Sequence, residues 1–191
     1  MSLGYVPPVP RLKLPARRGN PWVLAPWNDS AMVDSHGSQK GGRRGLILDL
    51  DAISLHDGVV EALQQLRVAG WQLAILTNGL PSVQFRTIAA LQLTTLVDEI
   101  VYAEEHVSEG KTAAAAFNAV LRSLDLSARQ CICVGDDLLR GARALGMRTI
   151  RIARAGWATA GGDDADIVIG SIRELPNAAL LLGDTVTADV A

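Results

Sequence analysis

Two aspartates separated by one residue, Asp49 and Asp51, follow the apolar segment GLIL and are the residues best suited to chemistry. The segment predicts a strand buried on both faces, and residues two apart on a strand point to the same side. Two carboxylates held in this way repel each other unless a cation or a shared proton relieves the repulsion. The pair indicates a metal or acid/base site, although an acidic turn after a buried strand is the simpler interpretation of the pair taken alone.

The elements that must position this pair alternate from Gly45 onward between apolar strands and amphipathic helices. Such alternation is typical of βαβ units and predicts an α/β fold, a three-layer α/β/α sandwich around a mainly parallel, Rossmann-like sheet. Expected strands cover 45–51, 71–79, 99–103, 131–137, 148–153 and 165–170. Expected helices cover 58–70, 81–93, 111–124, 137–146 and about 171–182.

Polar side chains follow several of these strands at the point where each strand ends. In an open parallel sheet, ligands bind outside the carboxyl ends of the strands, so these side chains are expected to share one crevice. The set consists of Asp49 and Asp51, Thr77 and Asn78, and Asp136 and Asp137, with Lys111 opening the helix before the last pair. Their convergence is stronger evidence for a site than any one motif.

Four motifs in this order give the chain a resemblance to the haloacid dehalogenase superfamily, whose members are mostly aspartate-dependent phosphatases. The motifs are LILDLD, ILTNG, the GK of EGKTAAAAF, and CVGDD followed by GARALGM. The resemblance runs from about Gly45 to Leu182. It implies the same fold and a phosphoryl-transfer enzyme, since an acid two residues after the nucleophile is the phosphatase pattern and an aromatic residue there is the dehalogenase pattern.

The resemblance also implies catalytic roles for individual residues. Asp49 would attack phosphorus to form an aspartyl-phosphate, and Asp51 would protonate the leaving alcohol and later deprotonate the hydrolytic water. Thr77 and Lys111 would complete the catalytic set by binding the transferring phosphoryl group and neutralising its charge. Substrate-binding residues are then expected to be Thr77, Asn78, Gly79 and Lys111.

A magnesium ion is the cofactor that the resemblance implies, because Mg²⁺ prefers oxygen ligands. Expected ligands are Asp49, the backbone carbonyl of Asp51, and Asp136, with Asp137 standing in for a further acid of the fourth motif. That motif, GDDLLRGA, is shorter here than in the family pattern. The shorter turn leaves open an alternative function, a catalytically impaired member that keeps the fold as a binding or assembly module.

Three regions are expected in the 191 residues. Residues 1–44 hold six of the eight prolines and seven basic residues against two aspartates, which predicts a basic arm and linker. Residues 45–185 form the α/β domain, with no room for a cap domain, and residues 186–191 form a tail. The arm lacks a dense basic run with interleaved aromatic residues, which argues against nucleic-acid binding.

Composition and hydropathy bound the remaining properties. No apolar run reaches the roughly 18 residues of a membrane helix and no secretory leader pattern is present, so a cytoplasmic protein without membrane association is expected. Cys131 and Cys133 are expected to be small buried strand residues. The expected partner is a phosphorylated small molecule or a phosphorylated macromolecule, and an oligomer is left open.

Overall fold

The protein is built on one parallel sheet. The computed structural model describes residues 42–54, 56–103, 114–136, 138–153 and 165–188. Within them, six strands pair side by side in the order β3-β2-β1-β4-β5-β6, all parallel. The strands are β1 (Gly45–Asp49), β2 (Gln72–Thr77), β3 (Glu99–Tyr102), β4 (Cys131–Gly135), β5 (Arg148–Ile152) and β6 (Ile167–Ile169). This order confirms the predicted Rossmann-like sheet.

The central strands β1 and β4 explain why the chain folds around them. Every residue of both strands is buried, because each strand packs apolar side chains against both faces of the sheet. Their register aligns Gly45 with Cys131 and Leu48 with Val134. The strand order reverses direction here, since β2 and β3 extend to one side of β1 while β5 and β6 extend beyond β4. Ligand crevices form at such switch points.

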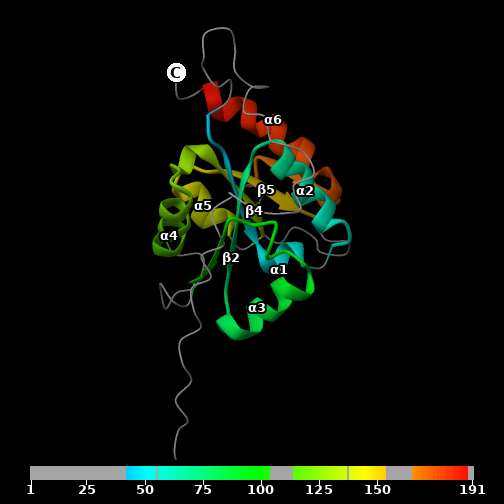
Figure 1. Ribbon diagram of the computed structural model, residues 1–191. Coiled ribbons are helices and arrows are strands. Elements are labelled where there is room, and N and C mark those ends of the chain that lie inside the picture. The colour runs from blue at the N-terminus through cyan, green and yellow to red at the C-terminus, as the bar shows by residue number, and fades with distance from the viewer. Residues whose placement is uncertain (1–41, 55, 104–113, 137, 154–164, 189–191) are drawn as a thin grey trace, which may run out of the picture.

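Helices cover both faces of the sheet (Figure 1). One buried cluster joins the sheet to α1, α2, α3 and α6, and a second joins the opposite face to α4 and α5. The helices are α1 (Leu50–Ile53), α2 (Val59–Val68), α3 (Pro81–Ala90), α4 (Ala114–Leu124), α5 (Leu139–Ala144) and α6 (Leu175–Ala188), with 3₁₀ turns η3 (Ala128–Gln130) and η4 (Ile172–Glu174). The predicted three layers are confirmed.

Most elements differ from the sequence-based ranges by one to three residues, and two differences are larger or bear on the site. The first strand stops at Asp49, and the next four residues form α1. The last helix starts at Leu175, after the η4 turn, and continues to Ala188. Ser171 explains the later start, because its hydroxyl caps η4 by accepting a hydrogen bond from the backbone N–H of Arg173 at 3.3 Å.

The residues just before β1 are attached to the domain. Arg44 places its guanidinium 4.5 Å from the ring centre of Trp71, which is buried at the start of β2. Arg43 donates hydrogen bonds to the Asp125 carboxylate at 2.7 Å and to the Leu124 carbonyl at 3.0 Å. Residues 1–41 of the predicted arm lie outside the described residues. The described end of the predicted linker therefore contacts the domain on two sides.

The connections after β1 and β2 are short. In the described part of 50–98, which lacks only residue 55, these connections consist of α1 and α2, then α3, and loops. Among the helices described, none is long and apolar enough to cross a membrane.

Candidate active site

Neighbouring strands bring three of the predicted site residues to the same edge of the sheet. Asp49 ends β1, Thr77 ends β2, and Asp136 directly follows β4. Asp49 pairs in register with Leu76, and the pairing of Leu48 with Val134 places Asp49 level with the last residue of β4. The crevice predicted from the strand ends therefore has side chains from β1, β2 and β4 along its edge.

The Asp49 carboxylate is buried and oriented by the turn into α1. The residue is 2% exposed, and Oδ1 accepts a hydrogen bond of 3.1 Å from the backbone N–H of Asp51. Asp49 is the N-cap of α1, with extended backbone angles of φ −76° and ψ 115°. Leu50 and Ile53 anchor α1 in the core. A buried carboxylate is costly unless hydrogen bonds or charges compensate it, so this position is specialised.

Asp51 is placed differently from the sequence-based expectation. The two aspartates were expected two apart on one strand, with their carboxylates on the same side. The strand instead ends at Asp49, and Asp51 lies in the first turn of α1 with an exposed side chain. Aspartate is a favoured helix N-cap, and Asp49 caps α1. The strand therefore ends at Asp49, and Asp51 no longer follows the side-to-side alternation of a strand. The pair therefore consists of one buried and one solvent-facing acid.

Gly135 is a site residue that the sequence reasoning did not single out. A Cβ added at this position would lie 2.8 Å from the Cβ of Asp49 and 3.3 Å from its Oδ2. Only glycine leaves room for the Asp49 side chain in its present position. The signal was available in the sequence, since glycine directly precedes Asp136 in CVGDD.

The end of β2 forms a tight turn into α3. Thr77 is fully buried and its hydroxyl donates to the Asn78 carbonyl at 3.2 Å. The same carbonyl accepts a hydrogen bond of 2.6 Å from Gln84 Nε2. Gly79 has φ +95°, which side-chain-bearing residues rarely adopt. Gln84 was also missed in the sequence, and it fixes the backbone that presents the Thr77, Asn78 and Gly79 segment.

Asp136 faces an arginine from the neighbouring strand. Arg151 Nε lies 3.5 Å from Asp136 Oδ1, and the two side chains are 16% and 38% exposed. Two other predicted site residues, Lys111 and Asp137, lie outside the described residues.

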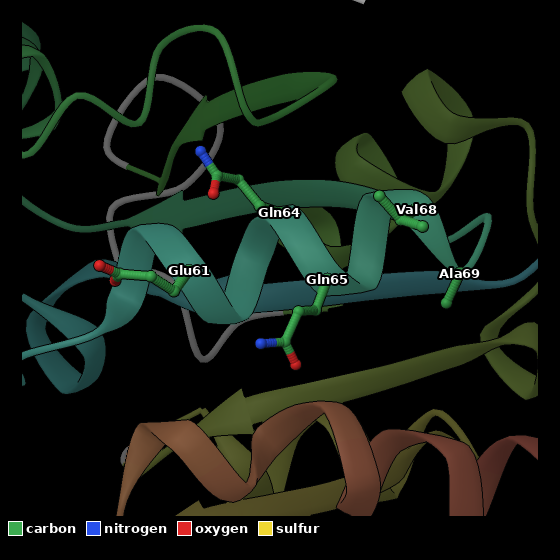
Figure 2. Close-up of a pocket in the computed structure, with 5 residues that line it drawn as sticks. All are labelled: Glu61, Gln64, Gln65, Val68 and Ala69. Atoms are coloured by element: carbon green, nitrogen blue, oxygen red, sulfur yellow. The ribbon is translucent and has the colours of Figure 1, made fainter. Parts of the chain in front are cut away.

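The cysteines and a hollow along α2 do not belong to this site. Cys131 and Cys133 are buried, as expected, and neither forms a disulfide. Burial raises the pKa of the Cys131 thiol to about 12, so this thiol stays protonated at neutral pH. A hollow of 510 Å³ lies along α2 (Figure 2). Its lining consists of Glu61, Gln64, Gln65, Val68 and Ala69. None of these was predicted to act in chemistry.

Curated phosphatases are similar to part of the chain. The chain is 36% identical over 104 residues to ribulose-1,5-bisphosphate 5-phosphatase of Halopiger xanaduensis, covering 53% of this chain and 43% of the relative. It is 28% identical over 120 residues to glyceraldehyde 3-phosphate phosphatase of Methanocaldococcus jannaschii, covering 61% and 52%. The chain thus spans about half the length of these curated relatives.

Solved structures share the fold. The crystal structure of a HAD phosphatase from Thermococcus onnurineus superimposes with a TM-score of 0.58 at 23% identity, covering 70% of this chain and 63% of that one. Residues 31–146 match the family described as haloacid dehalogenase-like hydrolases. That stretch contains Asp49, Thr77 and Asp136 with their strands. The chain therefore belongs to the haloacid dehalogenase-like hydrolases.

Proposed function

We propose that the chain is a magnesium-dependent phosphomonoester hydrolase that acts through an aspartyl-phosphate on Asp49. The observation that carries this proposal is the placement of the Asp49 carboxylate, buried at the end of β1 beside the side-chain-free Gly135. Its hydrogen bond from the Asp51 N–H and its fixed helix-capping position orient it before any substrate binds. A preoriented nucleophile removes part of the entropic barrier to attack.

The first half of the reaction uses both aspartates. An Asp49 oxygen forms a bond to phosphorus while the bond from phosphorus to the ester oxygen breaks. Asp51 gives its proton to the departing alkoxide, which leaves as an alcohol. The exposed position of Asp51 in α1 suits this role, because the leaving group departs toward solvent.

The second half restores the enzyme. Asp51, now a carboxylate, takes a proton from water as the water oxygen bonds to phosphorus. The bond from phosphorus to Asp49 then breaks, releasing inorganic phosphate. Thr77, Asn78, Gly79 and Lys111 are proposed to bind the phosphoryl oxygens throughout.

The donors present fit a hard cation. Asp49 and Asp136 offer carboxylate oxygens from neighbouring strands, and Asp51 offers a backbone carbonyl, the ligand types Mg²⁺ prefers. Within the described ranges, no three His, Cys, Asp or Glu side chains gather closely enough to hold a metal, so the proposed set relies on that carbonyl and on Asp137. Bound Mg²⁺ would reduce the electrostatic repulsion between the carboxylate nucleophile and the phosphate.

The proposed substrate is a phosphorylated small molecule. The two curated relatives are named for ribulose-1,5-bisphosphate and glyceraldehyde 3-phosphate, which favours this class over phosphorylated macromolecules. We propose that the 45–185 domain acts without a cap in the cytoplasm, with 1–44 as an arm and linker and 186–191 as a tail. The short connections after β1 and β2 support an open site.

Hydrolysis of a chromogenic aryl phosphate, with and without Mg²⁺, tests the proposal. We expect turnover that requires Mg²⁺ and is absent in Asp49→Asn. Beryllium fluoride mimics the phosphoryl group on an aspartate, so its binding to the wild-type protein but not to the variant separates an assembled site from an active one. No turnover in any phosphorylated metabolite, together with no beryllium fluoride binding, would favour the binding-module function.

A further inference from the structure

Arg151 lies in the same row of the sheet as the proposed nucleophile. It pairs in register with Gly135, which is level with Asp49. In a parallel sheet, residues in one row project to the same face. Ile47 and Cys133, two residues before Asp49 and Gly135, both face the α4 and α5 layer. Because Gly135 has no side chain, only its backbone separates the Asp49 and Arg151 positions.

The contact between Arg151 and Asp136 is an ion pair without a hydrogen bond. Nε approaches Asp136 Oδ1 at 3.5 Å, and Nε is a buried donor that makes no hydrogen bond in the structure as described. Buried donors are usually satisfied, and an unsatisfied one opposes folding unless a nearby charge compensates it. The compensating charge here is the Asp136 carboxylate. Arg151 is therefore held beside Asp136 by opposite charge and not by a directional hydrogen bond.

This arrangement gives Asp136 two uses. Its carboxylate is the described ion-pair partner of a largely buried guanidinium, and it is also a proposed ligand of the metal. A cation that binds Asp136 meets the positive charge of Arg151 beside the same carboxylate, and like charges at short distance repel. Metal binding and the ion pair therefore oppose each other.

We propose that Arg151 is the resident counter-ion of Asp136, a positioning residue that stabilises the metal-free site and lowers its affinity for Mg²⁺. The proposal rests on the proposed function, since it assumes that Asp136 is a metal ligand. Arg151 holds the Asp136 carboxylate in place when no metal is bound and makes the occupied fraction of the site depend on the free Mg²⁺ concentration.

The test is a titration of the full chain with MgCl₂ alone, by isothermal calorimetry and by thermal unfolding. Arg151→Gln removes the charge, and we expect a lower melting temperature without metal and a Kd for Mg²⁺ about tenfold lower than in the wild type. Arg151→Lys keeps the charge and should return the Kd toward the wild-type value. Arg151→Met retains an unbranched stem and replaces the Gln variant if that variant does not fold.

Arg148→Gln is the matched control, because Arg148 is at the opposite end of β5 and pairs with Asp166 at 3.3 Å. It removes the same charge from the same strand, and its Kd for Mg²⁺ should equal that of the wild type. Destabilisation of Arg151→Gln with an unchanged or higher Kd would make Arg151 purely structural and leave the proposed function standing.

Two further outcomes separate the inference from the proposed function. If the wild type binds no Mg²⁺ but Arg151→Gln does, the inference is supported and the wild-type site is held closed by its own arginine. If neither binds Mg²⁺, both the inference and the metal-dependent function are overturned.

Discussion

Asp166 lies at the amino ends of the strands and Asp136 at their carboxyl ends, and each pairs with an arginine of β5. Their surroundings differ. Asp166 Oδ2 accepts hydrogen bonds of 2.8 Å from both the backbone N–H and the hydroxyl of Thr149. Arg148 adds a contact at 3.3 Å to the other oxygen. Asp136 has the single described contact with Arg151 at 3.5 Å. One carboxylate is saturated with donors, and the other retains capacity to bind.

The hydrogen bonds to Asp166 also affect its titration. Burial alone would raise the pKa of Asp166, but the hydrogen bonds from Thr149, with Arg148 and Arg143 nearby, outweigh burial and hold the pKa below its ordinary value. Asp98, just before β3, likewise joins strands, because its carboxylate accepts a hydrogen bond of 2.8 Å from the backbone N–H of Leu73. Carboxylates at the amino ends of the strands (the amino edge) thus join strands, whereas those at the carboxyl ends (the carboxyl edge) are the ones that we propose for chemistry.

The largest effect is expected on phosphatase turnover, from substitution of Asp49 at the carboxyl edge. Asp49→Asn should lower phosphatase turnover at least about 1,000-fold, because the amide is not a nucleophile. Asparagine caps helices as well as aspartate does, so the free energy of unfolding should change by less than about 1 kcal/mol. Turnover and urea unfolding of the same preparation check both values. Loss of activity with a large loss of stability would show that Asp49 has the joining role of the amino-edge acids.

Crowding the nucleophile should be nearly as damaging. Gly135→Ala places a methyl group 2.8 Å from the Asp49 Cβ, and the resulting shift of the carboxylate should reduce kcat about 100-fold. Gly170→Ala is the matched control, since its added carbon would meet only Glu174 Oε1 at 3.5 Å, an ordinary contact. Steady-state kinetics of both variants check the prediction. Equal activities would mean that the Asp49 position tolerates displacement.

Substitution of Asp166, at the amino edge, should change the free energy of unfolding and its pH dependence. Because the folded-state pKa of Asp166 is lowered, its ionised form stabilises the protein above the ordinary carboxyl pKa, and this stability is lost as pH falls through the lowered value. Asp166→Asn should cost about 1–2 kcal/mol at pH 7 and flatten the stability profile below about pH 5. Urea unfolding between pH 3 and pH 7 measures it, conditions chosen to bracket the titration of carboxyl groups at about pH 4.

Asp136→Asn is the comparison for that experiment. Its carboxylate is 38% exposed and lacks a hydrogen bond from Arg151, so its loss should cost about 1 kcal/mol at pH 7, less than the loss of Asp166. Most of that cost comes from the partly buried Arg151, which is left without its compensating charge. An equal cost for the two aspartates would remove the distinction between joining and available carboxylates.

The smallest effect is expected at the exposed pair of Arg43 and Asp125. Their side chains are 52% and 86% exposed, so Asp125→Asn should change stability by less than about 0.5 kcal/mol. Asparagine also tolerates the positive φ of 54° at this position. Asp98→Asn, which weakens a bond to the Leu73 N–H, should cost more in the same denaturation series. A larger cost at Asp125 would contradict this ranking.

Much of the fold was predictable because it depends on local patterns. Apolar runs separated by amphipathic helices predicted the parallel sheet, and strand-end positions predicted that Asp49, Thr77 and Asp136 would share one edge. The helical position of Asp51 was not predictable from alternation, because the capping preference of Asp49 ended the strand. Arg151 was also missed, since only the register of β5 with Gly135 shows that this charged strand residue lies beside the proposed site.

The pairing of β1 with β4 joins segments that are far apart in the chain. During synthesis, β1, β2 and β3 can assemble first, with the β1 edge still unpaired. Asp49 becomes buried beside Gly135 only after β4 has been synthesised and has paired with β1. This pairing closes a long loop, and the entropic cost of loop closure makes it slow. A nascent or truncated chain that ends before β4 therefore lacks the proposed active site and exposes a central apolar strand, which favours aggregation. The same pairing of β4 with β1 removes this hazard and encloses the proposed nucleophile.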